Sequence, residues 1–237
     1  MDYYLYFIFR FGIIKQTYRY TIIEEVIIIN VYDFDKTIYY SDSTSDFYVF
    51  CLKRHPKIAA HFPKTMWAFI KYLLRINTKT QFKEVMYEFL HEVDIEKDLP
   101  DFWETHKNKI KPFYIEHKQD DDVIISASPE FLLEPICKIT GIKHLMASRV
   151  DPKTGKYTGI NCHGKEKVRR FSELYGDAVI DEFYSDAYCD TPLALKAVQS
   201  YMVKGDKVSP WKFRRKDKKN DHTALIINSD KKTDKTI

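Results

Sequence analysis

The sequence predicts an α/β fold with a parallel sheet, helices on both of its faces and a helical segment inserted after the first strand. Short apolar runs rich in β-branched residues at 26–32 and 123–128 are typical of strands buried on both faces, and 144–150 is predicted to be a third strand. Segments with helical periodicity alternate with these runs, as expected for strands that pair in parallel. A longer helical stretch separates the first strand from the second.

Composition is that of a globular protein. With 237 residues, 44% hydrophobic and 15% aromatic, the chain can bury a sizeable core as one domain with an insertion or as two small domains. The cysteines form neither a disulfide framework nor a CxxC zinc pair, and they are Cys51, Cys137, Cys162 and Cys189. A cytoplasmic location is the simple expectation, with peripheral contact to a membrane as the alternative.

The first 25 residues precede the predicted fold as an extension without a clear helical or strand period. Their apolar run is interrupted at Arg10 and is shorter than the ~20 residues that cross a bilayer. A basic leader and a small-residue cleavage site are also missing. We therefore expect neither a signal peptide nor a transmembrane segment here; a peripheral anchor and an extension outside the fold both remain open.

After the first strand, 41–46 is polar and turn-like, and 47–117 is expected to form a cap of about four helices. Its second helix, 64–76, gathers apolar residues on one side: Met66, Phe69, Ile70, Leu73 and Leu74. Residues 51–83 contain eight Lys and Arg and no Asp or Glu. This run is either a solvated face or, on a lid over an active site, a feature that favours an anionic substrate or surface.

The second half alternates strands and helices. Ser128 and Pro129 are expected to start a helix that ends near Gly141, as N-cap and first helical residue. Residues 151–159 suggest a hairpin flap, and 200–203 a last short strand. The tail, 212–237, is basic and predicted to be flexible and solvated, with an anionic partner as the alternative.

Polar side chains follow the predicted strands where ligands bind in open α/β sheets. Asp33, Asp35 and Thr37 follow the first strand, and Ser126 ends the second. Lys165 and Lys167 stand at a later helix start, and carboxylates at 186 and 190 follow a later strand. Asp-rich segments after strands are also common turn signals. Together, however, such groups supply what phosphoryl transfer requires: oxygen ligands for Mg²⁺, a carboxylate nucleophile, and a cation to neutralise phosphate.

Four segments in this order, DFDKT, IISAS, NCHGKEKV and YSDAYCD, resemble the four motifs of the haloacid dehalogenase superfamily of phosphohydrolases. The resemblance covers 26–211, and the helical insertion is similar to the cap of the phosphoserine phosphatase-like branch (subfamily IB). It implies a Rossmann-like core formed by 26–46 and 118–211, with the cap at 47–117. It also implies a Mg²⁺-dependent phosphomonoester hydrolase that forms an aspartyl-phosphate.

By this resemblance, Asp33 is the nucleophile and a Mg²⁺ ligand. Asp35 is the general acid and base, with its backbone carbonyl on the metal. Asp186 completes the metal shell, and Asp190 acts close to it or orients the lysine of the third motif.

The resemblance also assigns the phosphate-binding groups. Thr37 orders the loop of the first motif, and Ser126 holds the phosphoryl oxygens with backbone amides near Ala127. The cation is Lys167, which fits the motif better than Lys165. A zinc site at Cys162, His163 and Cys189 is disfavoured, because neither CxxC nor HxxxH spacing is present.

The substrate is less well defined. Nine residues beyond Asp33, where phosphoserine phosphatases bind the substrate's amino group with a glutamate, this chain has Asp42. The segment SASPEF differs from the glycine-rich form of those enzymes and is closer to phosphatidylglycerophosphatase C-like and uncharacterised phosphatases. A phosphorylated small molecule and a lipid phosphate both remain open, without a specific nucleic-acid partner. Phosphotransfer to an alcohol and a basic lipid- or nucleic-acid-binding module with a non-hydrolytic core are the alternative functions.

Overall fold

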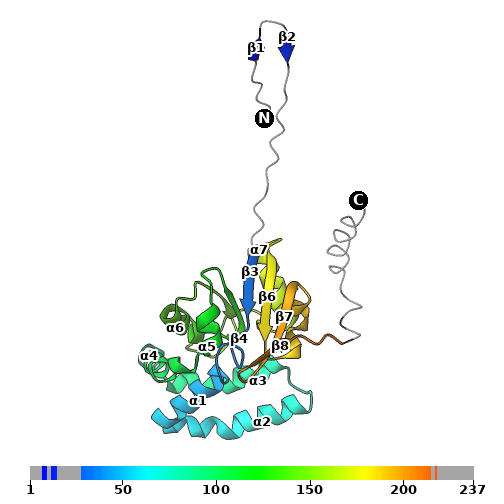
Figure 1. The fold of residues 1–237 in the computed structure, drawn as a ribbon. Coiled ribbons are helices and arrows are strands. Elements are labelled where there is room, and N and C mark those ends of the chain that lie inside the picture. The colour runs from blue at the N-terminus through cyan, green and yellow to red at the C-terminus, as the bar shows by residue number, and fades with distance from the viewer. Residues whose placement is uncertain (1–6, 10–11, 15–27, 215–216, 218–237) are drawn as a thin grey trace.

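The computed structural model describes residues 7–9, 12–14, 28–214 and 217, and its centre is a six-stranded sheet (Figure 1). The strand order is β5-β4-β3-β6-β7-β8. The strands are β3 (Ile28–Tyr32), β4 (Val123–Pro129), β5 (His144–Ser148), β6 (Val179–Ser185), β7 (Ala197–Lys204) and β8 (Lys207–Pro210). All neighbouring pairs are parallel except β7 and β8. The predicted fold class is confirmed.

Both faces of the sheet are buried, which explains the continuous apolar runs in the sequence. Val31 packs into one core, with Val123 and Ile125, whereas Tyr32 and Ile124 pack into the other. Successive side chains of a strand point to opposite faces, so adjacent residues must both be apolar when both faces are covered.

Helices supply the cover on each face. On the Tyr32 face lie α5 (Pro112–His117) and α6 (Glu130–Thr140), and on the Val31 face lie α7 (Lys165–Tyr175) and α8 (Thr191–Ala194). Tyr114 of α5 meets the ring of Tyr32 edge-on, with ring centroids 5.0 Å apart. On the opposite face, Phe171 of α7 is buried against the strands. None of the described helices is long and apolar enough to cross a bilayer.

The regular elements of the insertion between β3 and β4 are all helices. It consists of α1 (Ser43–Arg54), η1 (Pro56–His61), α2 (Phe62–Leu73), α3 (Lys79–Met86), η2 (Tyr87–Glu92), α4 (Ile95–His106), η3 (Lys107–Lys109) and α5. The expectation of a turn at 41–46 was wrong in part, because α1 already begins at Ser43. Asp42 is its N-cap and accepts a hydrogen bond from the Ser45 amide at 2.8 Å.

Two connections differ from the expected ones. The last strand is longer than predicted and turns at Gly205 (φ +58°) into β8, which the sequence analysis missed. The segment 151–159 forms no strand ladder; only one bridge, between Val150 and Tyr157, closes it. Gly155 in this segment has φ +67°, and a Cβ there would lie 2.7 Å from the Tyr87 Cβ. The loop therefore packs closely against the cap.

The ends of the chain are described only in part. In the first 25 residues, β1 (Phe7–Phe9) and β2 (Gly12–Ile14) pair as antiparallel strands, which the missing period of this segment did not indicate. The remainder of that segment, the first two residues of the predicted 26–32 strand and most of the predicted tail lie outside the described residues.

Candidate active site

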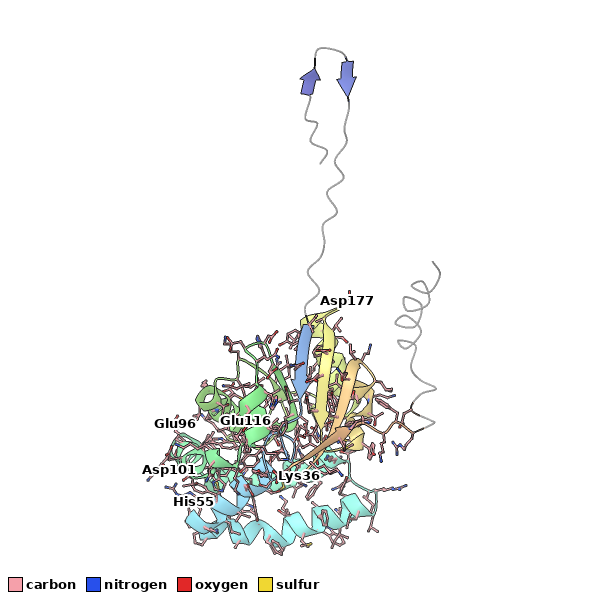
Figure 2. All side chains as sticks on the ribbon, in the orientation of Figure 1. Lys36, His55, Glu96, Asp101, Glu116 and Asp177 are labelled. Carbon is pink, nitrogen blue, oxygen red and sulfur yellow. The ribbon has the colours of Figure 1, made fainter. Side chains whose placement is uncertain are left out.

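The predicted site residues converge at the carboxyl edge of the sheet, around a cavity of about 210 Å³. Asp33 and Asp35 reach it from the loop after β3, Lys167 from the first turn of α7, and Asp186 from the loop after β6. The other predicted residues that line it are Asp42, Ser126, Ala127 and Asp190. Figure 2 shows this edge at Lys36, which also lines the cavity, and the opposite edge at Asp177.

The loop after β3 turns sharply to present its two carboxylates. The Phe34 carbonyl accepts the amides of Ile38 and Tyr39, both at 3.0 Å. Lys36 has φ 59°, a left-handed conformation that costs a non-glycine residue roughly 1–2 kcal/mol. Lys111, which is buried and does not belong to this loop, donates from its ammonium to the Lys36 carbonyl at 2.8 Å. A contact from outside the loop thus helps to hold this conformation.

Thr37 connects the loop after β3 with the loop after β6. Its hydroxyl donates to Asp33 Oδ2 at 3.3 Å and accepts the Asp186 amide at 3.0 Å. Thr37 is fully buried and is not among the residues that line the cavity. These two contacts are consistent with the predicted role of Thr37 in ordering the loop. We expect a phosphate to be contacted by residues that line the cavity.

Lys167 lies between two carboxylates. Its Nζ donates to Asp33 Oδ1 at 2.6 Å and to Asp190 Oδ2 at 2.7 Å, and the Ser185 hydroxyl donates to the same Asp190 oxygen at 2.8 Å. Burial opposes the charge of Lys167, but Asp190 and Asp33 outweigh it and raise the pKa of this lysine overall. Burial raises the pKa of Asp33 to about 7, against the opposing charge of Lys167. Lys165 does not line the cavity.

Asp35 is fixed through both of its oxygens. Oδ1 accepts the Ser43 amide at 2.7 Å, and Oδ2 accepts the Ser128 hydroxyl at 2.5 Å. Ser128 is in turn 3.1 Å from the Thr44 hydroxyl, which donates to it when Ser128 donates to Asp35. Burial and the charge of Asp42 raise the pKa of Asp35, partly opposed by these hydrogen bonds. A raised pKa suits a carboxyl group that must donate a proton.

The predicted role of Ser128 was therefore wrong. Pro129 is the N-cap of α6, without a side-chain cap hydrogen bond, while the Ser128 hydroxyl points to Asp35. Ser126 is buried and accepts the Ser128 amide at 3.0 Å. The end of β4 thus positions Asp35 through the Ser128 hydroxyl, and it lines the cavity with the Ser126 hydroxyl.

The cap contributes two cations that the sequence analysis did not single out. Lys79 and Lys83 of α3 line the cavity, and Lys83 Nζ donates to the Ala127 carbonyl at 3.0 Å. Burial, with the nearby charge of Lys79, lowers the pKa of Lys83 to about 8. Both belong to the acid-free run 51–83, which gave the only signal; nothing in that run tells which of its eight basic residues reach the cavity.

The donor set fits a Mg²⁺ ion. Asp33 and Asp186 offer carboxylate oxygens, and Thr37 connects the two residues by hydrogen bonds. No group of three or more His, Cys, Asp or Glu side chains is gathered as a metal site in the described part of the chain. Mg²⁺ typically takes one or two carboxylates and keeps several waters, so two carboxylates and the predicted Asp35 carbonyl suffice. Of the residues considered for zinc, His163 and Cys189 line the cavity, whereas Cys162 is fully buried and does not.

Comparisons with known proteins agree with this architecture. The haloacid dehalogenase-like hydrolase family matches residues 31–195, and the chain belongs to this family. The predicted family membership is confirmed. A probable phosphatase of Mycobacterium tuberculosis is 36% identical over 88 residues, which span 33% of this chain and 29% of that protein.

Solved structures share the fold at low sequence identity. A Bordetella pertussis protein of unknown function has a TM-score of 0.61 and 20% identity, covering 74% of this chain and 89% of that one. A probable phosphoserine phosphatase from Vibrio cholerae has a TM-score of 0.55 and 13% identity, covering 73% of this chain and 55% of that one. At these identities, the likenesses support the fold alone.

Proposed function

We propose that this protein is a Mg²⁺-dependent phosphomonoester hydrolase that works through an aspartyl-phosphate on Asp33. The observation that carries the proposal is the buried Lys167 between Asp33 and Asp190, at 2.6 and 2.7 Å, beside Asp35 in one cavity. A carboxylate nucleophile, a cation and a second carboxyl group are the parts that such a reaction needs. The similarity to a probable phosphatase supports the same conclusion.

In the first half-reaction, an Asp33 carboxylate oxygen attacks the phosphorus, and the bond to the leaving oxygen breaks. Asp35 gives its proton to that oxygen, so that the product leaves as an alcohol. Ser43 and Ser128 hold Asp35 at 2.7 and 2.5 Å, which fixes the direction of the transfer. Lys167 and the Ser126 hydroxyl neutralise the charge of the phosphoryl oxygens.

In the second half-reaction, water attacks the phosphorus of the aspartyl-phosphate. Asp35 takes the proton of this water, and the bond to Asp33 breaks to release inorganic phosphate. When bound at Asp33, Asp186 and the Asp35 carbonyl, Mg²⁺ supplies positive charge that neutralises the phosphate. Asp190 does not take part in bond making; through its contact at 2.7 Å it keeps Lys167 pointing at Asp33.

The cap side of the cavity favours a substrate with negative charge. Lys79 and Lys83 face the cavity from α3, and Asp42 is the carboxylate on the same wall from the start of α1. Asp42 already accepts the Ser45 amide, so its predicted contact with a substrate amino group must use its remaining capacity. Small phosphoesters and lipid phosphates both remain candidate substrates.

The test is phosphate release from a panel of phosphomonoesters, measured with Mg²⁺ and with EDTA. The panel contains phosphoserine, sugar phosphates, nucleotides and phosphatidylglycerophosphate in micelles. We expect release from at least one member that stops on chelation and returns with Mg²⁺. Activity that is insensitive to EDTA would refute the role of the metal. Inactivity across the panel, with the protein folded, would shift the assignment to phosphotransfer or binding.

A further inference from the structure

The outer helix of the cap exposes an apolar surface that no other described residue covers. Six large side chains of α2 and the turn after it are more than 40% exposed: Phe62, Met66, Trp67, Leu73, Leu74 and Ile76. Single exposed apolar residues are ordinary on a protein surface, but a contiguous group of this size marks an interaction site. Figure 1 shows α2 at the outer edge of the cap, on the side away from the sheet.

Only a narrow stripe of α2 packs against the rest of the cap. Ala68 is its one buried residue, and Tyr72 stacks on Phe82 of α3 with ring centroids 5.7 Å apart. Phe62, Met66 and Leu73 are spaced by four and seven residues and therefore lie together on another side of the helix. Most of the apolar residues that recur at helical spacing in this helix are therefore exposed at the surface.

Positive charge borders this apolar side. Residues 51–83 contain no Asp or Glu. Lys71 belongs to the last turn of α2, and its Nζ lies 5.6 Å from the centre of the exposed Trp67 ring; Arg75 follows in the turn after the helix, with φ 60°. Lys64 is the basic residue of α2 that is neutralised, by Glu88 at 2.7 Å.

We propose that α2 docks on the surface of an anionic phospholipid bilayer. A helix with bulky apolar residues and a tryptophan on one side and basic residues beside them lies in the plane of the interface, with its apolar side among the upper acyl chains. At 12 residues α2 is roughly 18 Å long, too short to span a bilayer. Lys71 and Arg75 are then placed to meet lipid phosphates.

A second copy of this chain is a poorer occupant of the same surface. Two copies that paired through α2 would bring two basic surfaces together, without an acidic residue in 51–83 to compensate. The proposal does not depend on the proposed reaction. It places the cap wall of the cavity close to the bilayer, because α3 packs against α2 and carries Lys79 and Lys83.

Trp67 makes the docking directly measurable. The chain has three tryptophans; Trp67 is 58% exposed, whereas Trp103 and Trp211 are buried. We expect vesicles of phosphatidylglycerol and phosphatidylcholine in equal amounts to shift the emission of the full-length protein to the blue, and lipids brominated in their acyl chains to quench it. Pure phosphatidylcholine vesicles are expected to give at least a tenfold weaker effect.

The matched variants are Leu73→Glu on α2 and Leu174→Glu on α7, which change leucines that are 62% and 68% exposed. Co-sedimentation with the anionic vesicles should weaken at least tenfold for Leu73→Glu and stay unchanged for Leu174→Glu. Vesicle binding without quenching of Trp67 would overturn the proposal and assign the binding to the basic tail. A dimer in lipid-free solution that Leu73→Glu dissociates, without vesicle binding, would overturn it in favour of a second copy.

Discussion

Among single residues, Asp122 illustrates what the burial of a carboxyl group does to stability. It precedes β4, is 2% exposed and accepts the Gln119 amide at 2.8 Å. Burial raises its pKa from 3.8 to about 6. Because the folded state holds this proton more tightly than the unfolded state, the stability contributed by the group is present below pH 3.8 and is lost as the pH rises to about 6.

Asp122→Asn should therefore stabilise the protein at pH 7 by about 1 kcal/mol and have little effect at pH 4. The measurement is the free energy of unfolding in urea at both pH values. Asp177→Asn, at an exposed aspartate, is the matched control and should change neither value. An equal effect of Asp122→Asn at pH 4 and pH 7 would show that Asp122 does not titrate between them.

Lys83 is the cap residue that we expect to contact the substrate, because it lines the cavity. Its ammonium lies against the end of β4 at Ala127, and its pKa is lowered to about 8. The positive charge is thus complete well below pH 8 and disappears as the pH rises through it. An anionic substrate should bind less well once the charge is gone.

We expect Lys83→Met to raise KM for a phosphoester about tenfold at pH 7, with a smaller effect on kcat. The wild-type KM should rise between pH 7 and 9, whereas that of Lys83→Met should stay level. Lys57→Met, at an exposed lysine of η1, is the control. If Lys83→Met kept the wild-type KM profile, the cap lysine would not be a substrate contact.

At this scale the sequence predicted the residues within motifs and missed their distant partners. Asp33, Asp35 and Lys167 were recognisable because each stands at a fixed place in a short segment. Ser128 was assigned to a helix cap, since serine before proline is a strong local signal, and its contact with Asp35 spans 93 residues. Lys83 contacts Ala127 across 44 residues, and no local pattern encodes such a pairing.

At the scale of secondary-structure elements, α4 joins the cap to the core. Trp103 on this helix is fully buried, and its indole N–H donates to the Leu132 carbonyl of α6 at 2.7 Å. Its ring also meets those of Phe34 and Tyr39, with centroids 6.2 and 5.7 Å apart. The loop that carries Asp33 and Asp35 is therefore supported from the cap.

Trp103→Phe should lower the free energy of unfolding by about 1–3 kcal/mol, because it removes ring volume and leaves the Leu132 carbonyl without this donor. Trp67→Phe changes the same residue type on the surface and should cost less than about 0.5 kcal/mol. Urea unfolding of both variants measures the difference. Equal effects would mean that α4 does not hold the loop in place.

The elements themselves were predicted best where both faces are buried. The run that ends at Tyr32 was recognised because it has no polar face. The start of α1 was missed, because an aspartate such as Asp42 is a signal for a turn and for a helix N-cap alike. β8 was missed because Lys207–Pro210 is short and mostly exposed, so its pairing with β7 gives little apolar pattern.

For the whole molecule, cap and core are joined by one continuous hydrophobic cluster. Phe47, Leu99 and Trp103 of the inserted helices pack with Tyr32 and Leu133 of the sheet and α6. The root of the cap is thus fixed to the core. Its outer edge, α2, has little part in this packing and leaves its apolar side exposed. The inner part of the cap therefore contributes to the stability of the fold, and the outer part is the surface that we propose for membrane docking.

The central claim is that Asp33 is the nucleophile of a phosphohydrolase, and the most direct test is the rate of phosphate release by Asp33→Asn with Mg²⁺ on a substrate found active in the panel. The change is nearly isosteric, so circular dichroism and the unfolding midpoint should show an intact fold. We predict a loss of at least about 10³-fold in kcat. Asp177→Asn, at the opposite edge of the sheet, should keep the wild-type rate (Figure 2). A wild-type rate for Asp33→Asn would contradict the account.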